Sequence, residues 1–215
     1  MKLGFIFAGQ GAQYVGMGKE LYEQYEVARD VFNQAHIDID VKKVCFEGPE
    51  DILNETSYAQ PCLLTTSLAI ARVIESYGIY PDYVAGLSLG EYSALTYAGA
   101  FDLQDAIAIV RRRGQLMSEA LPAGTTSMAA VLAMDASRIE DVIKDIDDVT
   151  IANYNCPGQI VITGKKEAVE KASEKLKEAG AKRVIPLKVS GAFHSPLLED
   201  ASMLSLIHIS EPTRH

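Results

Sequence analysis

The chain has 215 residues, of which 48% are hydrophobic and 23% are charged, a composition typical of a soluble globular protein. Its formal net charge of −9 at pH 7 argues against sequence-independent nucleic-acid binding, which needs a basic surface. No apolar run is long enough to cross a membrane, and the amino-terminal run is too short for a secretory signal. The three cysteines are widely spaced and form no disulfide or zinc pattern, which indicates a reduced, cytoplasmic protein.

The first apolar run, residues 3–7, is rich in β-forming residues and ends at a glycine turn, so it predicts a buried strand. The glycine-rich loop that follows, residues 9–16, does not fit a dinucleotide-binding loop because Tyr14 stands where a third glycine is needed. A loop after a first strand can instead present backbone amides to a nucleophile and complete an oxyanion hole.

Two helices are predicted before the next strand. Residues 20–35 mix apolar and charged residues at helical spacing. Residues 61–77 form a clearer helix, with Pro61 in the first turn and Gly78 as the stop. Gln60 comes directly before this helix; it is a candidate substrate-binding residue, and a plain capping or loop role is the alternative.

The most informative stretch is residues 83–95, where a short apolar run ends at Gly86 and a helical segment begins at Gly90. Ser88 lies between the two glycines, which is the G-x-S-x-G nucleophile elbow between a strand and a helix. Glycine is needed at both positions because strand and helix backbones come too close for a Cβ. The alternative is a glycine-rich turn with an incidental serine; the strand-before, helix-after setting favours Ser88 as the nucleophile.

A helix is predicted over residues 103–119, with Asp102 as its N-cap. At about 100° per residue, Arg113 falls beside the apolar stripe, Arg112 nearly opposite it and Arg111 to one side. We therefore expect one of the three arginines to face the interior, where a guanidinium must be paired. Its partner is either a carboxylate of the chain, in an internal salt bridge, or a carboxylate of the substrate, in a bidentate grip.

From residue 125 the pattern changes to a β-α-β-β-α-β order, that of the ferredoxin-like split βαβ unit. The boundaries of this subdomain fall near residues 122–124 and 190–191. The expected strands are residues 127–132, 149–155, 159–163 and 183–189, and the expected helices are residues 137–146 and 165–179.

His194 lies in a loop directly after the last of these strands and downstream of the serine, where a serine hydrolase fold supplies its base. A lone histidine is more often structural than catalytic. The other three histidines are His36, His208 and His215. They belong to a surface-like helix and to the tail, so His194 is the best candidate for a general base.

Together these residues resemble the malonyl-CoA:acyl carrier protein transacylase family. The resemblance covers residues 1–202, although Leu87 and Ala8 stand where many members have histidine and proline. Its landmarks are Phe7-Ala8-Gly9-Gln10-Gly11-Ala12-Gln13, Gln60-Pro61, Gly86-Leu87-Ser88-Leu89-Gly90-Glu91, Arg113-Gly114, Asn153-Tyr154-Asn155-Cys156-Pro157-Gly158-Gln159 and Gly191-Ala192-Phe193-His194-Ser195-Pro196.

The resemblance implies a role for each candidate. Ser88 would be the acylated nucleophile, His194 its general base, and Arg113 the residue that holds the free carboxylate of the malonyl group. The backbone amides of Gln10 and Leu89 would form the oxyanion hole. The implied fold is α/β, an α/β-hydrolase-like parallel sheet core with an inserted ferredoxin-like subdomain, and the active site lies between the two.

The resemblance also sets the expected boundaries: a core of residues 1–123 plus 191–202 and a subdomain of residues 124–190. Residues 203–215 resemble no part of the family and look like a translated sequencing adapter. We therefore expect a chain that is incomplete at its carboxyl end and lacks the group that orients His194. Poor solubility or low activity should follow.

The expected reaction is transfer of a malonyl group from malonyl-CoA to the phosphopantetheine thiol of acyl carrier protein, with no metal or cofactor. The alternatives are a serine esterase or thioesterase with the same elbow, and an inactive fragment. Acyl carrier proteins are acidic, so Lys182, Arg183 and Lys188 are candidates for docking them, and a solvated strand end is the alternative. No nucleic acid or membrane is expected as a partner, and the complete parent should be a monomer.

Overall fold

The computed structural model describes residues 2–122, 124–187 and 191–210. The chain divides into two compact units, one formed by residues 1–115 with 205–215 and the other by residues 116–204. Both units contain helices and strands, so the fold is α/β. Each unit has its own sheet and is described separately below.

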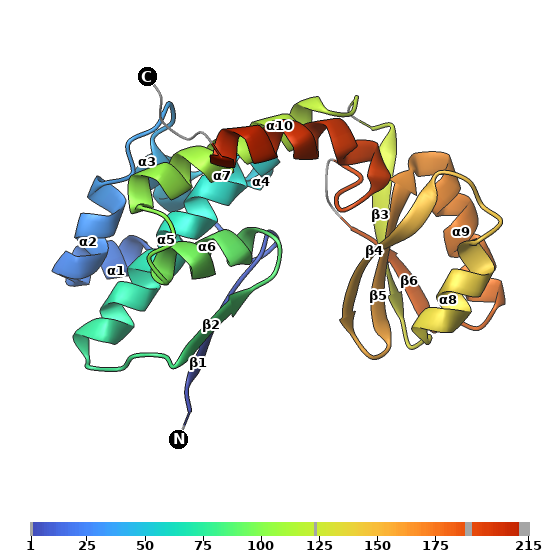
Figure 1. Ribbon diagram of the computed structural model, residues 1–215, viewed down its shortest axis with the longest axis horizontal. Coiled ribbons are helices and arrows are strands. Elements are labelled where there is room, and N and C mark those ends of the chain that lie inside the picture. The colour runs from blue at the N-terminus through green and yellow to red at the C-terminus, as the bar shows by residue number, and fades with distance from the viewer. Residues whose placement is uncertain (1, 123, 188–190, 211–215) are drawn as a thin grey trace. The chain divides into compact units, whose positions relative to one another are not determined.

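The sheet of the first unit is a parallel pair of strands, β1 (Gly4–Phe7) and β2 (Tyr83–Gly86), which run side by side (Figure 1). Their register places Phe7 opposite Gly86, so both strands end at the same edge. The sequence predicted both strands, and the structure confirms their positions. The expected burial of the first strand is wrong, because only Phe7 of β1 is buried and Ile6 is 86% exposed. The loop after β1 and the elbow after β2 therefore leave the sheet as neighbours.

Seven helices of this unit, among the described residues, come before residue 120: α1 (Lys19–Gln24), α2 (Glu26–Asn33), α3 (Val41–Glu47), α4 (Glu50–Asn54), α5 (Thr56–Ser76), α6 (Leu89–Tyr97) and α7 (Leu103–Glu119), the last of which ends in the second unit. The single helix predicted over residues 20–35 is wrong. The chain breaks at Tyr25, whose φ of −120° and ψ of 123° are extended. Helices α3 and α4 were not predicted, whereas the bounds of α7 agree with the expected ones.

Helix α5 begins at Thr56, so the prediction that it begins at Pro61 is wrong. Proline has no N–H, and inside a helix it leaves the carbonyl four residues earlier without its usual donor. Here that carbonyl belongs to Ser57, and the Nη1 atom of Arg111 donates to it over 2.7 Å. A side chain of α7 thus replaces the missing backbone donor, and the helix continues through the proline.

The core of the first unit surrounds α5, which is buried along most of its length. The largest fully buried hydrophobic side chains of this core are Phe32, Leu53, Leu64, Leu89 and Ile107. Leu89 is the residue directly after the candidate nucleophile, and it is only 1% exposed. Its burial anchors the start of α6 and so fixes where the preceding serine lies.

The second unit contains a four-stranded antiparallel sheet in the order β4-β5-β3-β6. Its elements are β3 (Thr126–Leu132), α8 (Ala136–Ile143), β4 (Val149–Cys156), β5 (Gln159–Lys165), α9 (Lys166–Glu178) and β6 (Arg183–Pro186). This is the β-α-β-β-α-β order that the sequence predicted. The last strand ends at Pro186, three residues before the expected end at Val189, which lies outside the described residues.

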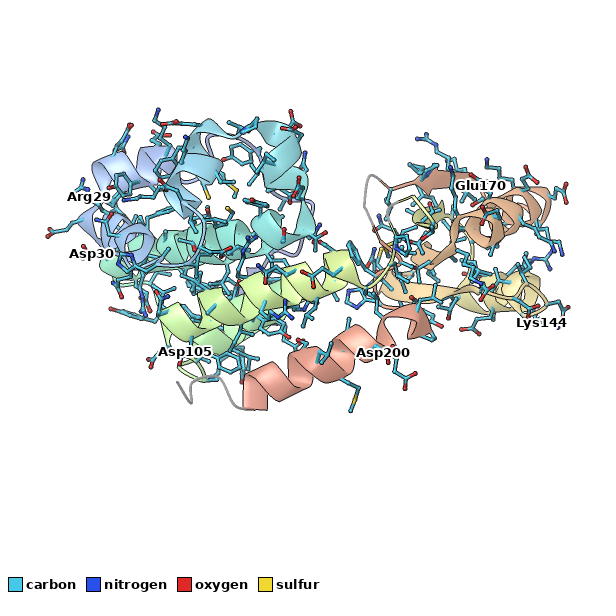
Figure 2. All side chains as sticks on the ribbon, turned by 90° about the horizontal axis from the view of Figure 1, so that it is seen from above. Arg29, Asp30, Asp105, Lys144, Glu170 and Asp200 are labelled. Carbon is cyan, nitrogen blue, oxygen red and sulfur yellow. The ribbon has the colours of Figure 1, made fainter. Side chains whose placement is uncertain are left out.

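Both faces of this sheet are covered. Ala129 and Val131 of β3 pack with α8 and α9, which lie on one face (Figure 1). Met128 and Ala130 alternate with them and pack on the other face against a cluster that includes Phe193. The outer faces of the helices carry charged side chains such as Lys144 and Glu170, which point away from the sheet (Figure 2).

After β6 the chain forms a short 3-10 turn, Pro196–Leu198, and then helix α10 (Glu199–Ser210). The backbone of α10 includes positions 203–210, which the sequence analysis assigned to a tail outside the family. Residues 211–215 of that tail lie outside the described residues, as do Ala123 and Ser190 at the expected boundaries of the subdomain.

Candidate active site

The elbow around Ser88 has the predicted geometry. Ser88 has a φ of 56° and a ψ of −110°, a backbone conformation that residues with a side chain rarely adopt. A Cβ on Gly86 would lie 2.0 Å from the carbonyl of Gly90, and a Cβ on Gly90 would lie 2.2 Å from the carbonyl oxygen of Phe7. Only glycine fits at either position, so the two glycines allow the sharp turn that presents the serine.

The serine also stands at the start of a helix. Ser88 is the N-cap residue of α6, which begins at Leu89. The first amides of a helix have no partner within it and carry the positive end of the helix dipole. Negative charge that develops on a group attached to Ser88 would therefore be favoured at this position.

The loop after β1 lies against the elbow, as expected from the parallel strands. A Cβ on Gly9 would lie 3.0 Å from the carbonyl oxygen of Leu87. Gln10, the next residue, is fastened by its side chain, whose Nε2 donates to Thr56 Oγ1 over 3.1 Å. Thr56 is 1% exposed, so this anchor is buried. Thr56 has no signal in the sequence that could have marked it as part of the site.

The next turn of this loop is held by Gln13. Its Oε1 accepts the backbone N–H of Gly11 over 2.8 Å, and its Nε2 donates to Asn54 Oδ1 over 2.8 Å. The two glutamines thus attach the loop to α4 and to the start of α5. Their side chains limit the positions that the backbone amides of the loop can take.

Arg113, on α7, contacts Ser88, the candidate nucleophile, directly. Its Nη2 donates to Ser88 Oγ over 3.1 Å, and its Nη1 donates to Gln60 Oε1 over 2.7 Å. Gln60 is fully buried inside α5, so it takes neither the loop nor the capping role considered as its alternative. The structure therefore brings together Ser88, Arg113 and Gln60, three of the residues singled out from the sequence.

No ion pair joins Arg113 to a carboxylate within the described part of the chain, so the internal salt bridge considered for it is not formed. Its charge is met by neutral groups: the amide of Gln60, the hydroxyl of Ser88 and the ring of Tyr92, whose centroid lies 5.3 Å from the guanidinium carbon. Burial lowers the pKa of the Arg113 guanidinium, because desolvation disfavours its charged form. A half-buried cation without a carboxylate partner is suited to bind an anion.

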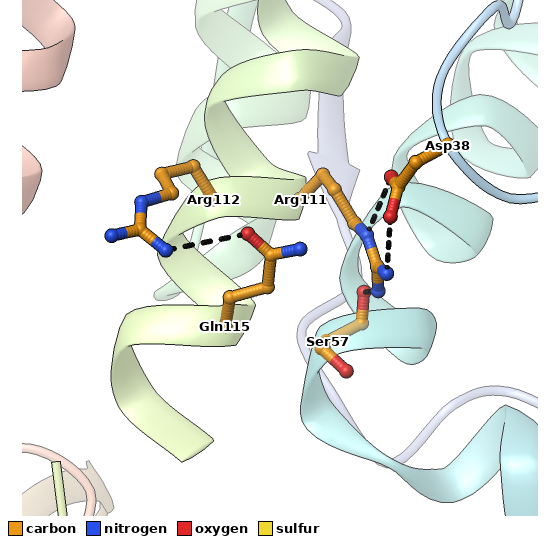
Figure 3. Close-up of polar contacts among 5 residues, drawn as sticks. All are labelled: Asp38, Ser57, Arg111, Arg112 and Gln115. Atoms are coloured by element: carbon orange, nitrogen blue, oxygen red, sulfur yellow. Dashed lines mark hydrogen bonds and ion pairs between the residues drawn. The ribbon is translucent and has the colours of Figure 1, made fainter. Parts of the chain in front are cut away.

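The expectation that only one of the three arginines faces inward is wrong. The side chain of Arg111 is only 11% exposed, and its guanidinium forms a bidentate pair with Asp38 at 2.9 and 2.7 Å (Figure 3). The hydrogen bonds from Arg111 hold the pKa of the Asp38 carboxyl below its usual value. Arg112 points away from Arg111, and its Nη1 donates to Gln115 Oε1 over 3.5 Å (Figure 3).

Helix α7 comes close to the start of α5 at Gly114. A Cβ at this position would lie 2.7 Å from the backbone of Thr56 and of Ser57. The same turn of α5 accepts the hydrogen bond from Arg111. The close approach and the hydrogen bond fix α7 against α5 on both sides of Arg113, which sets the distance between its guanidinium and the elbow.

Tyr92 was not recognised from the sequence. It lies on α6 four residues after Ser88, which is one helical turn, so it shares a face with that serine. An aromatic residue one turn after an elbow serine is the signal that could have found it. Its contact with the guanidinium shows that α6 contributes a ring to the surroundings of Arg113 in addition to positioning Ser88.

His194 belongs to the second unit, where Phe193, 7% exposed, packs against the sheet beside it. Its φ of 56° is in the left-handed region, so the backbone turns sharply at the histidine. The hydroxyl of Ser195 donates to the carbonyl of Ala192 over 2.7 Å and closes this turn. Ser88 lies in the first unit, and the pairing of Ser88 with His194 stays a prediction.

The remaining candidates concern partners. Lys182 and Arg183 are at the start of β6 in the second unit, whereas Lys188 lies outside the described residues. Across the described ranges, no cluster of three or more histidine, cysteine or acidic side chains could hold a metal ion. Nor does any helix in those ranges have the length and apolar character needed to cross a membrane.

The chain is similar in sequence to known proteins over nearly its whole length. A family model described as acyl transferase domain matches residues 4–212. The malonyl CoA-acyl carrier protein transacylase of Bacillus subtilis (strain 168) is 51% identical over an aligned length of 207 residues, and the match covers 94% of this chain. Those residues cover 65% of the Bacillus protein, so the chain spans slightly less than two thirds of that relative.

Solved structures agree with the sequence comparison. The malonyl CoA-acyl carrier protein transacylase of Clostridium perfringens (ATCC 13124) is 42% identical with a TM-score of 0.93, over 98% of this chain and 68% of that one. A malonyl-transacylase in complex with its type II PKS acyl-carrier protein is 40% identical with a TM-score of 0.94, over 98% and 70%. The resemblance seen in the motifs is thus confirmed, and the chain belongs to the acyl transferase domain family.

Proposed function

We propose that this protein transfers a malonyl group from malonyl-CoA to the phosphopantetheine thiol of an acyl carrier protein, a step of fatty acid biosynthesis. The observation that carries the proposal is the 3.1 Å hydrogen bond between Arg113 Nη2 and Ser88 Oγ. It places an uncompensated cation within reach of an acyl group on the serine. An acyl group that ends in a carboxylate would supply the missing negative charge.

In the first half-reaction, the Ser88 hydroxyl attacks the thioester carbonyl of malonyl-CoA while His194 accepts the hydroxyl proton. The oxygen–carbon bond forms first, and the resulting oxyanion is stabilised by the backbone amides of Gln10 and Leu89. Loss of one such donor typically costs about 3 kcal/mol of transition-state stabilisation. The carbon–sulfur bond then breaks, and coenzyme A leaves as a thiol with the proton from His194.

In the second half-reaction, the thiol of the carrier protein takes the place of coenzyme A. His194 accepts the thiol proton, sulfur attacks the serine ester, and Ser88 recovers its proton as the ester bond breaks. Arg113 keeps its contact with the free carboxylate throughout, so the malonyl group stays oriented between the two attacks. Lys182 and Arg183 are proposed to contact the acidic carrier.

The proposal includes an architecture. Residues 1–123 with 191–202 are taken as the acyltransferase core of an α/β-hydrolase-like fold, and residues 124–190 as a ferredoxin-like subdomain. The parallel β1–β2 pair before the elbow and the β4-β5-β3-β6 strand order support these assignments. We further propose that the protein works in the cytoplasm without a metal or organic cofactor.

Intact-mass spectrometry after mixing the chain with malonyl-CoA tests the first half-reaction. We expect a single malonyl adduct that maps to Ser88 and is absent from Ser88→Ala. In Arg113→Ala, the adduct from malonyl-CoA should fall sharply while the adduct from acetyl-CoA persists. An esterase would form adducts from neutral acyl donors regardless of Arg113, and an inactive fragment would form no adduct; either result would refute the proposal.

A further inference from the structure

Arg113 loses one of its contacts during the reaction. In the unacylated protein its guanidinium contacts Ser88, Gln60 and Tyr92. Once Ser88 carries an acyl group, its oxygen becomes an ester oxygen, which accepts hydrogen bonds more weakly than a hydroxyl. The contacts with Gln60 and Tyr92 must then hold a long, flexible side chain in place while the carboxylate binds to it.

Tyr92 is built to provide a rigid contact. It is half-buried and packs against the hydrophobic core of the first unit, so its ring is held from behind. The guanidinium carbon of Arg113 lies 5.3 Å from the ring centroid, within the range of a cation–π interaction. Tyrosine also lies one turn after Ser88 on the same helix, which ties the position of the cation to that of the nucleophile.

We propose that Tyr92 is a positioning residue that sets substrate selectivity: its ring holds the Arg113 guanidinium where it can bind the free carboxylate of a dicarboxylic acyl group on Ser88. This inference rests on the proposed function. Because Tyr92 acts through Arg113, it contributes to reactions of acyl groups with a free carboxylate and not to those of neutral acyl groups.

The electrostatics of Arg113 agree with this role. Burial lowers the pKa of the guanidinium, and the largest opposing effects come from Tyr92. Those effects act through the phenol group of Tyr92. Independently of them, the negative face of the ring, whose centroid lies 5.3 Å from the guanidinium carbon, offsets part of the cost of burying the cation without neutralising it with a carboxylate. A carboxylate in place of Tyr92 would compete with the substrate, whereas a ring leaves the site open to an anion.

The test is a competition between malonyl-CoA and acetyl-CoA for acylation of Ser88, measured by intact-mass spectrometry on wild type, Tyr92→Phe and Tyr92→Leu. The ratio of the two adducts is taken within each sample, so it does not depend on the fraction of protein that folds. We expect Tyr92→Leu to lower the malonyl-to-acetyl ratio by about 2- to 25-fold, the range that corresponds to loss of a cation–π contact. Tyr92→Phe keeps the ring and should retain most of the selectivity.

Tyr22→Leu is the matched control, because Tyr22 lies under Arg29 in a similar pair, at 5.8 Å, within the same unit. Tyr22→Leu should leave the malonyl-to-acetyl ratio unchanged, although it removes the same ring from a similar arginine pair. An unchanged ratio in Tyr92→Leu, together with a lowered ratio in Arg113→Ala, would overturn the role of Tyr92 alone. A wild-type chain that forms no adduct, or an unchanged ratio in Arg113→Ala, would overturn the proposed function and this inference with it.

Discussion

The Nη2 atom of Arg113 donates a hydrogen bond to the Oγ atom of Ser88 over 3.1 Å, so the cation and the proposed nucleophile are direct neighbours. In the proposed reaction, the acyl group on Ser88 must fold its carboxylate back to a cation that is almost in contact with the ester oxygen. The short distance between Arg113 and Ser88 should therefore restrict the length of the acyl chain, in addition to favouring one that ends in a carboxylate.

We therefore expect succinyl-CoA to acylate Ser88 about 10- to 200-fold more slowly than malonyl-CoA, because one extra methylene carries the carboxylate past the guanidinium. Pre-steady-state acylation rates for the two thioesters measure this. Propionyl-CoA and butyryl-CoA have the same numbers of acyl carbons without a second carboxylate and control for chain length, and the preference for malonyl over succinyl should disappear in Arg113→Ala. Equal rates for malonyl and succinyl in wild type would contradict this reading of the distance.

The elbow gives a prediction about stability. Gly90→Ala would place a Cβ 2.2 Å from the carbonyl oxygen of Phe7, and we expect it to lower the free energy of unfolding by about 3 kcal/mol. Gly4→Ala, in strand β1, is the control, since its Cβ would meet nothing closer than 3.8 Å. Urea denaturation of both variants measures the difference, and similar midpoints would show that the elbow can relax.

The anchor between Thr56 and Gln10 predicts a change in rate without a change in selectivity. Thr56→Val keeps the shape of the side chain but removes the buried acceptor of the Gln10 amide. The loop that carries the proposed oxyanion donor should then be less well placed, and acylation of Ser88 should slow by about tenfold.

The slowing in Thr56→Val should be the same for malonyl-CoA and acetyl-CoA, because the oxyanion forms with either. Thr56→Ser restores the hydroxyl and should recover most of the rate. Quenched-flow mixing followed by mass spectrometry measures the acylation rate of Ser88 in each variant. A loss confined to malonyl-CoA would place the effect at the carboxylate site and not at the oxyanion.

The Asp38–Arg111 pair predicts how stability depends on pH. The pKa of Asp38 is lower in the folded protein than in the unfolded chain, so the stability that the pair contributes is fully present above the unfolded pKa, about 3.9. It is lost as the pH falls through the lower, folded value. Asp38 is 56% exposed, so solvent screens the pair and the effect should be modest.

Thermal melting of wild type and Asp38→Asn should therefore differ at pH 6 and converge below about pH 4. Asp30→Asn, which removes an exposed carboxylate of α2, controls for the change in net charge. A difference in melting temperature that is the same at pH 6 and at pH 3 would show that the loss comes from packing and not from the ionised pair.

The parts of the site that depend on neighbouring residues were predictable from the sequence. Gly86, Ser88 and Gly90 specify the elbow because each acts on the backbone next to it. The bounds of α7 followed from its apolar period, and the same period placed Arg113 beside the interior. These features need no knowledge of what the helix packs against.

The parts that depend on distant partners were not predictable. The angle of about 100° per residue that placed Arg113 gives the direction of a side chain but not its partner. It therefore did not predict that Arg111 is buried, which Asp38 and the Ser57 carbonyl make possible. The start of α5 was missed for the same reason. Tyr92 was missed because its role appears only when α6 and α7 are both in place.

The proline inside α5 ties the assembly of the site to the order of synthesis. The carbonyl of Ser57 receives its donor from Arg111, 54 residues further along the chain. A nascent chain that has been synthesised only to the end of α5 can form the part of the helix after Pro61. The turn that carries Gln60 then still lacks the hydrogen bond from Arg111 to the Ser57 carbonyl. The acceptor that orients the arginine would become ordered only after the arginine-bearing helix has emerged, so the anion-binding end of the site would mature later than the strands beside it.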